Sequence, residues 1–299
     1  MTTNTVDRRP RGGVLASTPV RFVVFSVALI GAYVGAQFAV AQFAMVWAPG
    51  LLPGLDRGLV TASGWSLSCV LLLLFYAALV RVFERRSPSE LAPRPGAGLA
   101  FAGAAGGFLL FALVLAALFA LGLARWSGGG DAAHIAPMAI AAAFAAVGEE
   151  LAIRGGVFRV LEEGLGSLAA LVLSASLFGL LHAGNTGATP VSTAAIAVEA
   201  GLLLGAAYMA TRNLWLPIGL HFGWNFTEGG VFGAAVSGGR SHGVWPVSIG
   251  GPELLSGGAF GPEASIVAVA ISLAATLSLI AVAVRRGEWR PLRLRLWVA

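Results

Sequence analysis

Charged residues are scarce in this sequence. Asp, Glu, Lys and Arg make up 11% of its 299 residues, whereas a soluble domain carries roughly 25%. Lysine does not occur, and Cys69 is the single cysteine. One cysteine excludes an intrachain disulfide and argues against redox chemistry, so we expect Cys69 to be a small buried residue of a helix. The shortage of charge indicates a protein whose solvent is lipid.

Long apolar stretches take the place of the missing charge. Hydrophobic residues make up 57% of the chain, and the mean hydropathy is +0.83. A helix needs roughly 20 apolar residues to cross a bilayer. Windows of this kind occur at 22–48, 64–83, 97–124, 132–158, 167–188, 191–211, 213–236 and 264–284. The sequence therefore predicts an all-α polytopic membrane protein of about eight transmembrane helices, with its first helix retained rather than removed as a signal peptide.

The arginines are distributed unevenly about these spans. Arg57, Arg125 and Arg240 fall in the loops on one side, and Arg154 lies within a span. The others fall on the opposite side: Arg8, Arg9, Arg11, Arg21, Arg81, Arg85, Arg86, Arg94, Arg159, Arg212, Arg285, Arg286, Arg290, Arg293 and Arg295. This is the positive-inside pattern, so we predict that both termini are cytoplasmic. The net charge of +5 then reflects topology and contact with the lipid bilayer, and we expect no nucleic-acid partner.

The stretch AAVGEELAIRGG carries three charged residues at the end of an apolar run. Charge in the middle of a membrane is costly, so such residues are expected to face each other or a wet cavity and to mark a functional site. Glu150 and Arg154 are spaced i, i+4 with the acid first, the favoured order for an ion pair on one helix. Glu149 is rotated about 100° from Glu150. We therefore expect Arg154 to hold Glu150 and to leave Glu149 free for acid–base work.

Two further pairs on later spans are also spaced i, i+4. Phe178 and His182 lie in SASLFGLLHAGN, and His221 and Asn225 lie in LPIGLHFGWNFTEG. A carboxylate and an imidazole beside one water can take its proton and later pass it to a leaving group, and an amide donor suits an oxyanion. Alternatively, Glu149, His182 and His221 could hold a divalent metal such as zinc that activates the water. Hydrolysis of a peptide bond by water within the membrane uses all of these groups.

The three motifs EExxxR, FxxxH and HxxxN follow one another on separate apolar spans. In this arrangement the chain resembles the CAAX-processing and bacteriocin-processing family of intramembrane proteases, also called CPBP or Abi proteins. The resemblance implies that Glu149 is the catalytic acid and base, supported by Glu150 and Arg154. It also implies that His182 helps Glu149 to activate water, and that His221 and Asn225 stabilise the oxyanion. Family members have been described with a metal-dependent and with a metal-free glutamate mechanism, and the position of Asn225 beside His221 favours the metal-free arrangement.

The resemblance divides the chain into parts. We predict a cytoplasmic N-terminal arm at 1–21, a variable three-helix membrane region at 22–124 and a CPBP-like catalytic core at 130–236. An outer loop at 237–263 and a last helix with a basic cytoplasmic tail at 264–299 complete the prediction. The expected location is a bacterial cell membrane, and the expected partner is a membrane-associated or lipidated peptide or protein substrate.

Two other functions use the same residues. A proton-coupled transporter also places Glu and His within a bundle, although the first half of this chain has no polar counterpart to the second. A non-catalytic membrane scaffold would keep the fold, but no motif residue has been lost. Glu199 belongs to no motif, and we expect it to pair with a nearby arginine or histidine. Straight helices would leave Glu149 and His182 roughly 10 Å apart along the membrane normal, so tilt, a longer fifth helix or a short element at 159–167 must close that gap.

Overall fold

The computed structural model describes residues 17–292. The predictions for the arm at 1–16 and for the end of the basic tail at 293–299 lie outside the described residues. The described chain is all-α, as predicted, with 75% of the residues helical and one two-stranded antiparallel ribbon between β1 (Ala124–Trp126) and β2 (Val247–Ile249).

The membrane helices follow one another with short connections. The first half of the described chain contains α1 (Thr18–Gln42), η2 (Phe43–Trp47), α2 (Ala48–Leu51), α3 (Arg57–Phe83), η3 (Ser89–Leu91) and α4 (Pro93–Ala120). The second half contains η4 (Ala132–His134), α5 (Ile135–Glu150), η5 (Leu151–Phe158), α6 (Arg159–Leu165), α7 (Ser167–Leu181), α8 (Pro190–Ile196), η6 (Ala197–Leu202), α9 (Leu203–Thr211), α10 (Trp215–Asn225), η7 (Phe226–Val231), α11 (Glu253–Ser256), η8 (Pro262–Ala264) and α12 (Ile266–Arg285).

Each of the eight predicted spans is helical over most of its length, but not all are long. Six described helices are long and apolar enough to cross a membrane: Thr18–Leu51, Arg57–Phe83, Pro93–Ala120, Ala132–Leu165, Pro190–Thr211 and Ile266–Arg285. The other two, α7 and the continuous helix α10–η7, are shorter. The span predicted at 167–188 ends early because Gly184, Asn185 and Gly187 follow His182, and glycine and asparagine favour turns over helix. The chain is thus a multi-pass membrane protein in which six described helices meet the criterion of length, and the finer prediction of eight spans stays a prediction.

Local sequence signals set several helix ends. Asp56 and Ser265 cap α3 and α12 by accepting hydrogen bonds from backbone N–H groups of the first turn. Thr189 and Ser192 form a capping box at α8, whose first residue is a proline. Gly166 separates α6 from α7 in a left-handed conformation with φ of 86°, and a Cβ there would come 2.4 Å from a backbone oxygen.

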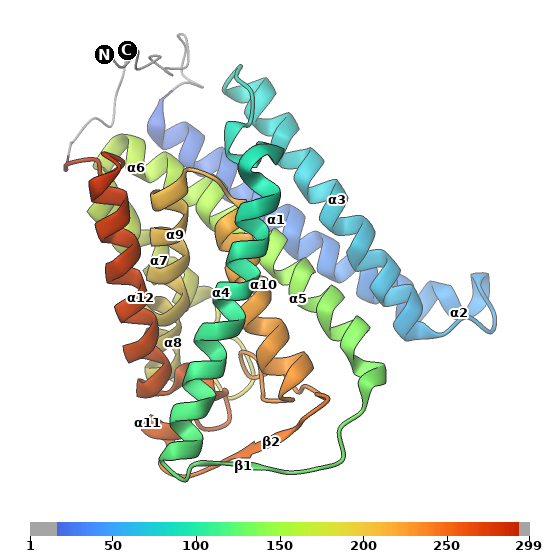
Figure 1. Cartoon of the computed structure of the whole chain (residues 1–299). Coiled ribbons are helices and arrows are strands. Elements are labelled where there is room, and N and C mark those ends of the chain that lie inside the picture. Colours follow the sequence, from blue (N-terminus) through green and yellow to red (C-terminus); the bar gives the residue numbers. More distant parts are fainter. Residues whose placement is uncertain (1–16, 293–299) are drawn as a thin grey trace.

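Two groups of helices make up the bundle. Figure 1 shows α1, α3 and α5 slanting together on one side, beside a more upright group that includes α4, α7, α9, α10 and α12. The ribbon and α11 lie at the lower end, whereas α1 begins and α12 ends at the upper end. Large apolar side chains such as Val27, Leu74 and Phe101 are exposed on the outside, as expected where lipid is the solvent.

The helices α4 and α10 pack backbone to backbone. Gly103 and Gly107 on α4 face Gly219 and Gly223 on α10, so each helix presents a small residue every fourth position. A Cβ at Gly107 would lie 2.2 Å from the Leu220 carbonyl oxygen, which no side chain tolerates. This close approach fixes the position of α10, the helix that carries His221.

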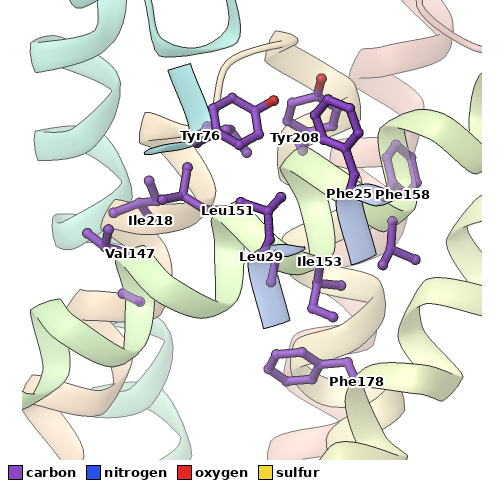
Figure 2. Packing of buried hydrophobic residues seen from close by; sticks show 14 of the residues in the cluster. Phe25, Leu29, Tyr76, Val147, Leu151, Ile153, Phe158, Phe178, Tyr208 and Ile218 are labelled. Carbon is purple, nitrogen blue, oxygen red and sulfur yellow. The ribbon is translucent and has the colours of Figure 1, made fainter. Parts of the chain in front are cut away.

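The main hydrophobic core lies where the two groups meet. Figure 2 shows Phe25 and Leu29 from α1 against Leu151, Ile153 and Phe158 from η5, with Tyr76, Phe178, Tyr208 and Ile218 arriving from other helices. All these side chains are buried. The core therefore surrounds the segment that directly follows the two glutamates.

Buried ion pairs join helices at the upper end in Figure 1. Glu84 accepts hydrogen bonds from Arg21 and Arg159, and Glu90 binds Arg86 at 2.8 Å. Burial alone would raise the pKa of Glu90, but the hydrogen bonds from Arg86 and the charge of Arg159 outweigh it and lower that pKa to about 2. The Glu90 carboxylate is therefore charged at neutral pH and ties the loop between α3 and α4 to α6.

Candidate active site

The first motif lies where an α-helix widens into a π-helix. Glu149 and Glu150 are the last two residues of α5, and the π-helix η5 begins at Leu151. π-helical segments are rare and occur frequently at functional sites. Two other π-helices, η6 and η7, lie on the neighbouring helices, next to α8 and α10. A further described π-helix, η2, lies at the end of α1, so three of the four described π-helices belong to the helices of this region.

Glu150 is held by two cationic or ionisable groups. Its Oε1 accepts a hydrogen bond from Arg154 Nη1 at 2.8 Å and lies 3.0 Å from His221 Nδ1. Glu150 and Arg154 are fully buried. Arg154 Nη2 donates to the backbone oxygens of Ala200 and Gly201 in η6, each at 3.0 Å, and the guanidinium lies over the Phe178 ring. The predicted Glu150–Arg154 contact is present, and it links α5, η5, η6, α7 and α10.

Glu149 points in another direction and has different neighbours. Its Oε1 accepts a hydrogen bond from the Tyr33 hydroxyl at 3.1 Å, and its Oε2 lies 3.9 Å from His182 Nε2. Oε2 is buried and has no hydrogen-bond partner. The two adjacent glutamates thus each face one histidine, on different helices.

His182 has a defined ring orientation. It is the C-cap of α7, and its Nδ1 lies 2.8 Å from the carbonyl oxygen of Phe178. A carbonyl oxygen can only accept, so Nδ1 carries the hydrogen and donates it. In the neutral ring Nε2 is then an acceptor, and this is the nitrogen that faces Glu149.

A small cavity lies beside these groups. Its wall includes His182, His221 and Asn225, and so brings the second and third motifs together. Glu199, expected to pair with an arginine or histidine, also lines the cavity. The remaining lining residues are Phe178, Ile196, Ala200, Leu203, Leu204, Leu220, Trp224, Ser237 and Glu263.

Helix tilt removes the expected axial gap between Glu149 and His182. The helix α7 is shorter than predicted, and residues 159–165 simply continue the helix from η5. Figure 1 shows α5 crossing the bundle obliquely beside the upright α7. The 3.9 Å between Glu149 Oε2 and His182 Nε2 shows that the gap is closed.

Three residues at the site were missed in the sequence. Tyr33 comes from α1, whereas Ser237 and Glu263 come from the stretch predicted as an outer loop. Ser237 donates a hydrogen bond to Glu263 Oε1 at 2.6 Å, and Glu263 is 3% exposed although its segment is not part of a membrane helix. None of the three residues belongs to a motif. Only Glu263 carried a signal in the sequence, as an acidic residue in a Gly-rich loop.

A metal ion such as zinc is one of the two alternatives that the sequence leaves open. Among residues 17–292, no group of three or more His, Cys, Asp or Glu is arranged to hold a metal ion. His221 Nδ1 is engaged by Glu150, and His182 Nδ1 is engaged by a backbone carbonyl. Such hydrogen bonds at Nδ1 orient a histidine and leave its Nε2 available, which is also the arrangement of metal-binding histidines.

Comparison with known proteins agrees with the motifs. Residues 131–227 match the profile of the Rce1-like family, described as type II CAAX prenyl endopeptidase Rce1-like. No curated protein and no solved structure matches the chain significantly. The matched stretch contains all three motifs, and the resemblance inferred from them is confirmed. Residues 131–227 are a domain of the Rce1-like type II CAAX prenyl endopeptidase family.

Proposed function

We propose that this chain is an intramembrane endopeptidase in which Glu149 is the general base and acid. Membership of the Rce1-like family implies intramembrane protease activity and points to protein substrates in the membrane. The observation that carries the residue assignment is the unequal surroundings of the two glutamates. Each carboxylate keeps one oxygen without a hydrogen bond, but Glu150 is fully buried and bound by Arg154 and His221, whereas Glu149 is about one-fifth exposed and, among the described residues, is bound by Tyr33 alone.

Activation of water follows from the Glu149–His182 geometry. A water between Glu149 Oε2 and His182 Nε2, which are 3.9 Å apart, donates one hydrogen to each of these acceptors. Its lone pair is then directed at a substrate carbonyl carbon in the cavity. As the oxygen–carbon bond forms, the proton moves to Glu149 Oε2, and the carbonyl π electrons move onto the carbonyl oxygen.

His221 and Asn225 stabilise that oxyanion. The Asn225 amide donates directly, and both residues line the cavity one helical turn apart. His221 Nδ1 donates to Glu150, so its Nε2 is a donor in the imidazolium form, which the Glu150 carboxylate stabilises. When the tetrahedral intermediate collapses, the carbon–nitrogen bond breaks. Glu149 returns its proton to the leaving nitrogen, which gives a carboxylic acid and an amine. The acid then passes the second hydrogen of the water to the amine, so the final products are a carboxylate and an ammonium group.

The test is cleavage of a library of lipid-anchored and transmembrane peptides by the purified chain in liposomes, with and without chelator. Glu149→Gln keeps the side-chain shape but removes the base, so we expect no turnover and an unchanged melting temperature. Glu253→Gln, which changes an exposed glutamate at the start of α11, is the matched control and should keep full activity.

Four results would contradict the proposal in different ways. Full activity of Glu149→Gln would remove Glu149 as the base. Activity lost to chelator and restored by zinc would replace the metal-free mechanism. If the wild-type chain moves protons across the liposome membrane but cleaves no peptide, the transporter is favoured. If it shows neither of these activities, the scaffold is favoured.

A further inference from the structure

We propose that Tyr33 is a positioning residue for Glu149. Tyr33 lies on α1, outside the stretch that matches the Rce1-like family. It holds one oxygen of the Glu149 carboxylate so that the other faces His182. This inference rests on the proposed catalytic role of Glu149 and adds α1 to the active site.

The hydroxyl of Tyr33 fixes the carboxylate by a specific bond. It donates to Glu149 Oε1 at 3.1 Å, whereas Oε2 has no hydrogen-bond partner and lies 3.9 Å from His182 Nε2. A carboxylate anchored by one oxygen cannot rotate freely about its last bond. The free oxygen therefore stays directed at the place where the proposed water binds.

The residue before Glu149 makes room for the tyrosine ring. A Cβ at Gly148 would come 2.1 Å from Tyr33 Cδ2 and 2.4 Å from Cε2. The ring thus lies directly against the backbone of α5, one residue from the carboxylate that its hydroxyl binds. Any larger side chain at 148 would push the hydroxyl away from Glu149.

Aromatic packing also holds the Tyr33 ring against α5. The ring centroids of Tyr33 and Phe144 are 5.2 Å apart, and Phe144 in turn stacks on Trp65 of α3 at 5.8 Å. Phe144 lies one turn before Gly148 on α5. Tyr33 of α1 thus packs on Phe144 of α5, and Trp65 of α3 supports it through Phe144.

Other ionisable groups near Glu149 do not replace this bond. His182 faces Oε2, and Glu150 is occupied by Arg154 and His221, whose charges act on Glu149 through space. Among the described residues, Tyr33 is the group that forms a hydrogen bond with this carboxylate. Loss of the Tyr33 hydroxyl should therefore slow the reaction by changing the position of the Glu149 carboxylate.

The experiment compares Tyr33→Phe with the wild-type chain on the best-cleaved peptide of the lipid-anchored library, in liposomes. The variant keeps the ring and its packing, so we expect unchanged KM and kcat lower by roughly 10–100-fold, typical for loss of an outer partner of a reacting group. Tyr208→Phe removes the hydroxyl of another buried tyrosine away from the site and should leave kcat unchanged. A wild-type kcat in Tyr33→Phe would overturn the proposal.

A second measurement tests the contact without relying on cleavage. Melting temperatures of Tyr33→Phe, Glu149→Ala and the double variant form a cycle, and we expect the double variant to fall by less than the sum of the single shifts. Additive shifts in an active protein would overturn the inference alone. A coupled cycle in a chain that cleaves no peptide would overturn both the positioning role and the proposed function.

Discussion

Glu149 and Glu150 are neighbours in the sequence, but their surroundings assign them different work. Successive helix residues point about 100° apart, so the two side chains meet different helices. Glu150 is fully buried and shares one oxygen between Arg154 and His221. Glu149 is about one-fifth exposed and faces His182, and each of the two carboxylates keeps one oxygen without a hydrogen-bond partner. In the proposed mechanism, this pair of adjacent carboxylates supplies one structural anion and one reactive base.

The variant Arg154→Ala tests the structural role of the Glu150–Arg154 pair. Removing the guanidinium leaves the buried Glu150 and two backbone oxygens of η6 without their donor, and breaking a buried pair costs about 3–5 kcal/mol. We expect a lower melting temperature, less protein in the membrane and loss of cleavage. Arg240→Ala, in an exposed loop, should change none of these. An inactive Arg154→Ala with normal stability would instead make Arg154 a residue that touches the substrate.

The motif residues could be predicted from spacing, whereas their partners could not. The i, i+4 rule was enough to pair Glu150 with Arg154 and to separate Glu149 from them. It could not reveal the contact of His221 with Glu150, because that contact joins residues 71 positions apart. Tyr33 and Glu263 reach the site from helices and loops without a motif, so nothing local marks them.

At the scale of elements, the apolar windows predicted the helices, and the turns between them were harder to place. Hydropathy averages over many residues, and the windows at 167–188 and 213–236 ran through the glycines that end α7 and the helix α10–η7. The π-helices could not be predicted either, since their wider hydrogen bonds depend on tertiary packing rather than on composition. One of these π-helices, η6, nevertheless supplies the two backbone oxygens that Arg154 binds.

The packing of α4 on α10 gives a prediction at this scale. Gly107→Ala would place a methyl group 2.2 Å from the Leu220 carbonyl oxygen, so the helices must separate, at a cost of about 1–3 kcal/mol. Because Leu220 precedes His221, we expect lower cleavage as well as a lower melting temperature. Gly106→Ala is the matched control, since no atom lies within 4 Å of its added Cβ. Equal stability of the two variants would show that the close approach of α4 and α10 does not occur.

At the scale of the whole molecule, charge separates the two ends of the bundle. The loop between α3 and α4, the turn after α6 and the end of α12 meet at the upper end in Figure 1, and the arginines of these segments lie there. The lower end carries the ribbon, and Arg125 of β1 is one of the few basic residues there. The arrangement of the helices thus agrees with the uneven distribution of arginines in the sequence, and α1 starts at the end where α12 finishes.

The positive-inside rule then predicts that the upper end is cytoplasmic. Cys69 is the single cysteine, so Cys69→Ala provides a background in which one new cysteine can be labelled in cells. Ser87 is exposed in the loop between α3 and α4, and Ser127 is exposed just after β1 at the opposite end. We expect a membrane-impermeant maleimide to label Ser127→Cys in intact spheroplasts, and to label Ser87→Cys only after the membrane is opened. The reverse pattern would place the arginine-rich end outside, and labelling of both in intact spheroplasts would show that the two loops do not lie on opposite sides of a membrane.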